Sequence, residues 1–127
     1  MKSEIIYNKR MRRFKRTEIE LAVKYQPIRI KTQNWYSTVI RGLGTGGICM
    51  ISLEYLGIGT IIQIQLPLTS SSKIIVVTGE VLWSDFLIDR NLYEAGIKFI
   101  NLKSNEKEMI STLIDKFNAG FIKISIN

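Results

Sequence analysis

The feature that most restricts the fold is a series of short β-type runs that are separated by turn residues and not by helices. The residues in these runs alternate between apolar and polar, or are rich in β-branched and aromatic types, as in half-buried strands. The runs cover 19–25, 35–40, 48–53, 60–66, 73–83 and 92–100. Parallel pairing would need long crossovers between them, so they predict an antiparallel sheet. Closure removes exposed sheet edges, and we therefore expect a six-stranded antiparallel (split) β-barrel.

The spacing of apolar residues changes after position 100 from that of a strand to that of a helix. Asn105 and Glu108 have the spacing of a capping box, and an amphipathic helix is predicted from about 105 to 118. Gly120 is a suitable stop. The predicted class is thus all-β with one C-terminal helix, which would cover an open face or end of the barrel. This domain would span 18–120, followed by a tail at 121–127 whose alternation is compatible with a short added strand.

Residues 1–17 form a basic N-terminal arm, with a short helix possible around Ile5–Tyr7. The chain carries 18 Lys and Arg against 11 Asp and Glu, a net charge of +7, and most of the excess lies in the first sixteen residues. Arg12, Arg13 and Arg16 are part of it. A local basic excess indicates an anionic partner: nucleic acid, a membrane surface or a nucleotide. The alternative is a solvated tail that only confers solubility.

Composition argues against catalysis and against a metal centre. The 127-residue chain has no histidine, the commonest general base and neutral metal ligand, and its carboxylates show no paired spacing. Cys49 is the only cysteine and lies in an apolar run, where we expect a buried small side chain. No cofactor is expected. Neither a signal peptide nor an apolar stretch of the ~18–20 residues of a membrane span is present, so a cytoplasmic protein is predicted.

Four of the six residues from Gly42 to Gly47 are glycine, and the segment formally matches G-x-G-x-x-G. In dinucleotide-binding folds this motif must open a helix whose N-terminus faces the phosphates. Here an apolar strand follows, so that interpretation is rejected. Two compatible explanations remain for the glycines. One is a hairpin turn that needs positive φ, and the other is a backbone that approaches an anion closely.

The order of these motifs resembles the PilZ domain, a bacterial receptor module for the second messenger cyclic di-GMP. Arg12 and Arg16 satisfy the R-x-x-x-R motif that opens the family. Gly79 to Trp83 is similar to its G-x-x-V-x-W strand, and Tyr93 to Phe99 to its Y-x-x-G-I-x-F strand. The resemblance runs from about residue 10 to residue 117. It implies a PilZ-like barrel and a signalling role for this chain.

The second family motif, D/N-x-S-x-x-G, is degenerate in this chain. Its first and third positions are Gly42 and Gly44, and only Gly47 matches. Two lost hydrogen bonds of ~1.5–3 kcal/mol each would weaken binding by ~10² or more. The neighbouring Thr45 and Arg41 could partly compensate. The ligand-binding residues that the resemblance implies are Arg12, Arg16 and Gly47, with Arg13, Arg41, Gly42, Gly44 and Thr45 as secondary candidates.

Three functions compete. The first is a non-catalytic PilZ-like domain that binds cyclic di-GMP, and in which the ligand draws the basic arm onto the barrel. The second is a degenerate PilZ adaptor that has lost the nucleotide and acts through an unidentified protein partner in motility, secretion or polysaccharide export. The third is a barrel that binds single-stranded nucleic acid through a basic groove and stacking aromatic side chains. Trp35, Tyr36 and Trp83 could supply the rings, but they are as readily explained as core residues, and we regard this function as the weakest of the three.

Overall fold

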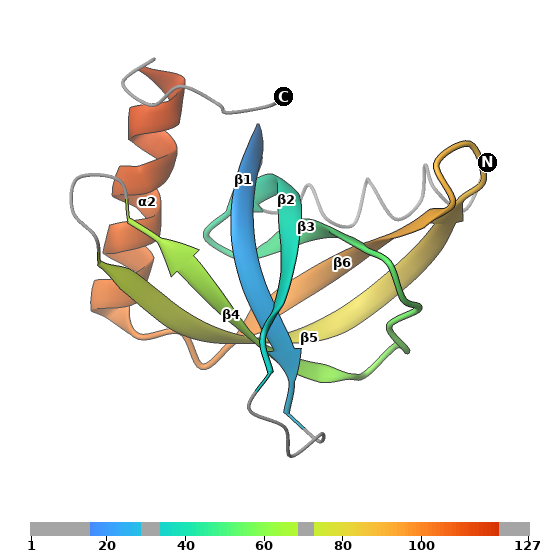
Figure 1. The fold of residues 1–127 in the computed structure, drawn as a ribbon. Helices are drawn as coiled ribbons and strands as arrows, with labels where there is room; N and C mark the ends of the chain where they lie inside the picture. Colours follow the sequence, from blue (N-terminus) through green and yellow to red (C-terminus); the bar gives the residue numbers. More distant parts are fainter. Residues whose placement is uncertain (1–15, 29–33, 69–72, 120–127) are drawn as a thin grey trace.

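The computed structural model describes residues 16–28, 34–68 and 73–119, with the backbone alone described at 16–18. It shows a closed antiparallel barrel in the order β1-β2-β3-β6-β5-β4 and a helix, α2, after the last strand (Figure 1). The elements are β1 Arg16–Pro27, β2 Tyr36–Gly44, β3 Gly47–Ser52, β4 Ile61–Pro67, β5 Ile74–Leu87, β6 Leu92–Ile100 and α2 Ser104–Asn118. The predicted fold class is confirmed. The possible N-terminal helix and C-terminal tail strand lie outside the described residues.

The barrel closes through β1, which pairs with strands on both sides. It pairs with β2 from Arg16 to Tyr25 and with β4 from Lys24 to Pro27. The interior is filled by the alternate residues that the sequence pattern predicts. In β4, for example, Ile62, Ile64 and Leu66 are fully buried, whereas the residues between them are partly exposed. Burial of a side chain of this size contributes about 1.5–3 kcal/mol.

β5 is longer than predicted. The sequence indicates a loop from 84 to 91, but the strand continues to Leu87 and pairs with β6 down to Leu92. Ser84 and Asp85 are polar and therefore predict a loop, yet they pair with Ala95 and Glu94 of β6, which pair with β3 on their other side. This hairpin projects from the barrel (Figure 1).

The glycines of β5 and β6 are required for close packing between these two strands. A Cβ on Gly79 would lie 2.4 Å from Ile97 Cγ2, and one on Gly96 would lie 2.0 Å from Trp83 Nε1. A glycine inside a strand often marks a bulge, but the register shift in β5 lies between Val81 and Trp83. Gly79 is therefore a packing glycine in a regular part of the strand.

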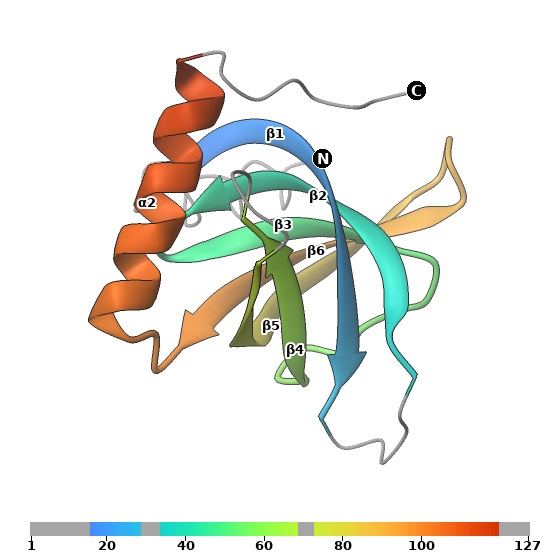
Figure 2. The same ribbon diagram turned by 60° about the vertical axis from the view of Figure 1, so that its left-hand side comes forward.

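α2 lies across one end of the barrel and contacts β1 and β2 (Figure 2). Ile110 and Leu113 enter the core, with exposed fractions of 0% and 2%. No helix in the described ranges is long and apolar enough to cross a bilayer. The predicted cap, Asn105 with Glu108, is wrong. The N-cap is Lys103, whose backbone N–H donates to Glu106 Oε1 at 3.0 Å. Both pairs have the same three-residue spacing, so the pattern alone could not distinguish them.

Candidate ligand-binding groove beside the glycine turn

The glycine segment forms the connection between β2 and β3. Leu43 pairs with Ile48, and Thr45 and Gly46 make the bend. The expected positive φ is absent here, because within the described residues Gly59 is the only glycine with positive φ, at 90°. The hairpin turn is confirmed, but the prediction that its glycines provide positive φ is wrong.

Gly47 has a packing role instead. It pairs with Lys98 of β6, and a Cβ at Gly47 would lie 2.1 Å from the backbone oxygen of Ile97. No real Cβ contact is that short, so β3 and β6 approach this closely only because position 47 has no side chain. The one residue that matches the second family motif is thus required by the fold itself.

The start of β1 lies beside the same turn. Arg16 is the register partner of Gly44, and Glu18 is the partner of Gly42. The structure therefore brings the backbone of one predicted ligand-binding arginine next to the glycine turn. The Arg16 side chain is not described, and Arg12 and Arg13 lie outside the described residues, so their part in binding stays a prediction.

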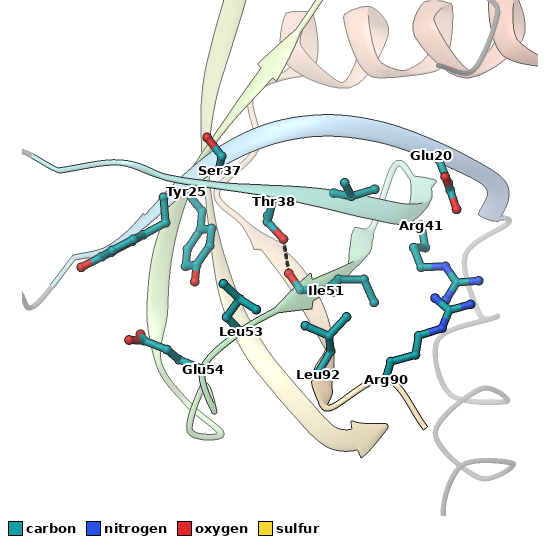
Figure 3. Close-up of a pocket in the computed structure, with 12 residues that line it drawn as sticks. Glu20, Tyr25, Ser37, Thr38, Arg41, Ile51, Leu53, Glu54, Arg90 and Leu92 are labelled. Atoms are coloured by element: carbon teal, nitrogen blue, oxygen red, sulfur yellow. Dashed lines mark hydrogen bonds between the residues drawn. The ribbon is translucent and has the colours of Figure 1, made fainter. Parts of the chain in front are cut away.

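Arg41 occupies a β-bulge. On one side of β2, the register shifts between Ile40 and Gly42, so that Arg41 has no partner of its own on β3. On the other side, the β1 register shifts between Glu18 and Leu21. Bulges re-aim side chains. Ile40 and Leu43 are fully buried, and Arg41 extends outward into a surface groove (Figure 3).

This groove has a volume of about 670 Å³, within the range of small-ligand sites. The residues that line it are Glu20, Tyr25, Tyr36, Ser37, Thr38, Val39, Arg41, Ile51, Leu53, Glu54, Arg90 and Leu92. Figure 3 shows the side chains of Arg41 and Arg90 pointing toward each other from opposite walls, with Glu20 beside Arg41. Thr38 Oγ1 donates a hydrogen bond to the carbonyl of Ile51 and so joins β2 to β3 along the floor.

The other end of the groove is aromatic. The ring centroids of Tyr25 and Tyr36 lie 5.6 Å apart at an interplanar angle of 40°. The Tyr25 hydroxyl lies 3.3 Å from Ser52 Oγ, which also accepts from the Glu54 N–H at 3.1 Å. Burial, the largest cause, raises the pKa of Tyr25 above its ordinary value of 10.0. The groove therefore has a cationic end near the glycine turn and an aromatic end away from it.

Two further features bear on reactivity: the single cysteine, Cys49, and the arrangement of possible metal ligands. Cys49 has an exposed fraction of 4%, as predicted for a buried small side chain, and its Sγ donates to Glu94 Oε2 at 3.1 Å. Across the part of the chain that the structure describes, no cluster of His, Cys, Asp and Glu could hold a metal ion.

Sequence reasoning missed Arg90 as a site residue. It lies in the short turn between β5 and β6, where the backbone N–H of Arg90 donates to the carbonyl of Leu87 at 3.1 Å. No local motif marks it. Only the pairing of β6 with β3, in which Tyr93 faces Ser52, brings this turn beside the groove.

Comparison with known proteins agrees with this architecture. Residues 10–116 match the PilZ domain family, to which this chain therefore belongs. No match was found among curated proteins.

Solved structures share the fold at low identity. MotI/DgrA, the inhibitor of motility of Bacillus subtilis, is 12% identical with a TM-score of 0.69, and the match covers 88% of this chain and 53% of that one. This chain thus spans about half the length of the Bacillus protein. The PilZ domain of YcgR from Escherichia coli, solved with cyclic di-GMP, is 11% identical with a TM-score of 0.62, covering 87% and 98%. The PilZ domain of CeSA from a cellulose-synthesizing bacterium is 11% identical with a TM-score of 0.61, covering 81% and 97%.

Proposed function

We propose that this PilZ domain is a non-catalytic receptor that binds cyclic di-GMP in the cytoplasm and passes the signal to a protein partner. Family membership and the cyclic di-GMP in the YcgR structure support the choice of ligand. The observation that carries the proposal for this chain is the pairing of Arg16 with Gly44. It puts the end of the R-x-x-x-R motif against the turn that corresponds to the second family motif.

The chemistry of such a site is favourable. A guanidinium can donate two hydrogen bonds to guanine O6 and N7, stack on the base and offset phosphate charge. Arg12 and Arg16 would supply these groups, with Arg13 as a secondary contributor. In this proposal Gly42, Gly44 and Thr45 let the turn approach the ligand. Because Gly42 and Gly44 replace polar residues, binding should be weaker than in a PilZ domain with both motifs, by ~10² or more.

Titration calorimetry of the whole chain with cyclic di-GMP tests the proposal. We expect heat of binding with the wild type and its loss in Arg16→Ala. Lys107→Ala is the matched control, because Lys107 is an exposed cation on α2 that does not line the groove. Loss of binding in both variants, or in neither, would contradict the assignment of Arg16.

Restoring the second motif gives the complementary experiment. Gly44→Ser returns the hydroxyl that the family carries at this position, and it should strengthen binding by about tenfold. Circular dichroism and thermal unfolding of the variant establish that the buried position tolerates the new side chain. A folded Gly44→Ser protein with unchanged affinity would show that the turn does not contact the ligand.

The second candidate function is that of an adaptor that no longer binds the nucleotide. Exposed apolar residues near the projecting hairpin favour a protein-binding surface: Tyr55 is 58% exposed, Phe86 45% and Ile88 81%. Tyr55 and Phe86 both pack against Tyr93, with ring centroids 5.7 Å and 5.1 Å apart. The family suggests a partner in motility, secretion or polysaccharide export. Absence of heat at high micromolar cyclic di-GMP would select this function over the receptor.

A further inference from the structure

We infer that the groove binds a phosphate or phosphodiester group between the guanidinium groups of Arg41 and Arg90. The inference deepens the proposed function and rests on it for the identity of the ligand, but the anion subsite itself depends only on the geometry of the groove. Neither arginine belongs to the R-x-x-x-R motif, and Arg90 lies some fifty residues further along the chain than Arg41.

The two side chains come from independent elements and converge. Arg41 extends from the β2 bulge and Arg90 from the turn between β5 and β6, and they point toward each other across the groove (Figure 3). Among the described residues, no hydrogen bond or ion pair engages either guanidinium. Two facing cations repel each other. An anion between them is attracted to both guanidinium groups and offsets that repulsion.

The donor geometry favours a phosphate group. A guanidinium presents parallel N–H donors that match the oxygens of a phosphate in pairs. A phosphodiester keeps two unesterified oxygens and can offer one to each arginine. Val39, Ile51 and Leu92 also line the groove, and these apolar side chains suit a ligand with an aromatic or apolar body attached to the phosphate. A nucleotide has this combination.

The charge of Glu20 is expected to lower the affinity of the subsite for an anion. Its side chain lies beside Arg41 in Figure 3 and lines the same groove. One carboxylate beside two guanidiniums leaves the cluster cationic, but it opposes the arriving anion. The charge of Glu20 should therefore weaken binding, and its removal should strengthen it. This opposite sign distinguishes an anion subsite from a general structural effect.

The position of Arg41 relates this subsite to the degenerate motif. Arg41 directly precedes Gly42, the position at which the family carries Asp or Asn. The chain thus lacks the polar side chain of the motif but carries a cation one residue earlier, re-aimed by the bulge. Arg41 and Arg90 would supply contacts that the glycine turn cannot make.

The test compares Arg41→Gln, Arg90→Gln and Glu20→Gln with wild type in the whole chain, with Lys107→Gln as the control outside the groove. Each is titrated with cyclic di-GMP and, separately, with sodium pyrophosphate at constant ionic strength. For at least one of the two probes, we expect Arg41→Gln and Arg90→Gln each to lower the affinity about tenfold or more. Glu20→Gln should raise the affinity for that same probe several-fold. Lys107→Gln should bind both probes with the wild-type affinity. Arg90 is an exposed turn residue, so Arg90→Gln and Glu20→Gln decide the question even if Arg41→Gln fails to fold.

The outcomes separate the inference from the proposed function. Binding of cyclic di-GMP that is lost in Arg16→Ala but unaffected by the three groove variants overturns the subsite and leaves the receptor function standing. Pyrophosphate binding that needs both arginines, without binding of cyclic di-GMP, supports the subsite and overturns the receptor function. Binding of neither probe overturns both.

Discussion

Gly47 and Ile97 lie so close together that a single methyl group at position 47 would come within 2.1 Å of the Ile97 backbone oxygen. The contact joins β3 to β6, and the neighbouring Ile48 and Ile97 are fully buried. The sequence motif thus coincides with a tight backbone contact in the barrel wall.

The first prediction follows from this contact. Gly47→Ala should lower the free energy of unfolding by about 1–3 kcal/mol, because the strands must separate to admit the methyl group. Urea unfolding measures the change. Gly57→Ala is the matched control, since its Cβ would meet Thr60 Oγ1 at an ordinary 3.5 Å. Equal stability of the two variants would contradict the packing role of Gly47.

The second prediction concerns Trp83, whose indole lies over Gly96. A Cβ at position 96 would be 2.0 Å from Trp83 Nε1, and the side chain of Trp83 is only 4% exposed. Gly96→Ala should displace the indole toward solvent and shift its fluorescence emission to the red. The measurement is made in a Trp35→Phe background, so that Trp83 is the only tryptophan, and at an excitation wavelength that selects tryptophan over tyrosine. Unchanged emission in a folded variant would show that the strand can accommodate the methyl group without moving the ring.

The third prediction is a loss of stability at alkaline pH through Tyr25. Burial raises the pKa of Tyr25 in the folded protein above the ordinary 10.0 that it recovers on unfolding. As the pH is raised, the unfolded state therefore loses the Tyr25 proton at a lower pH than the folded state does. The contribution of Tyr25 to stability is fully present below pH 10 and is lost as the pH rises through the folded-state pKa.

Tyr25→Phe provides the reference for that measurement, because other tyrosines and the lysines also titrate in this range. The phenylalanine variant should start about 1 kcal/mol less stable, since it lacks the hydrogen bond to Ser52. The difference in unfolding free energy between the two proteins should then narrow as the pH rises above 10. A constant difference would mean that the pKa of Tyr25 is not raised by folding.

The fourth prediction is that α2 is part of the core and not an accessory. Leu113→Ala should cost about 2–5 kcal/mol, because Leu113 is 2% exposed and packs within the barrel core. The adjacent Thr112 is exposed, and Thr112→Ala should change stability little. Thermal unfolding compares them. If both variants unfold at the same temperature as the wild type, the helix does not stabilise the end of the barrel.

The strands could be predicted because their period is local information. Alternation in 60–66, for example, predicts the buried face of β4 that the structure shows. The end of β5 could not be predicted, because Ser84 and Asp85 carry no apolar signal and are held by pairing with β6. The local sequence pattern predicts which face of a strand is buried, but it does not predict which strand will pair with it.

The candidate site could likewise be predicted only in part from the sequence. The glycine turn and Arg41 could be found from motif and position. The facing of Arg41 and Arg90 depends on a bulge in β2 and on the register of β6 against β3. Both arise from packing between residues far apart in the sequence, so no short window of sequence contains them.

The uneven pairing of β1 has a mechanical consequence. Its two ladders overlap only at Lys24 and Tyr25, so within the described strands the stretch from Arg16 to Val23 is fastened along a single edge. Peeling of this stretch away from β2 would break one row of hydrogen bonds and leave the seam with β4 intact. The amide protons of residues 16–23 should therefore exchange with solvent faster than those of β4. A ligand bound to Arg16 would slow this exchange, because it would hold the start of β1 in place.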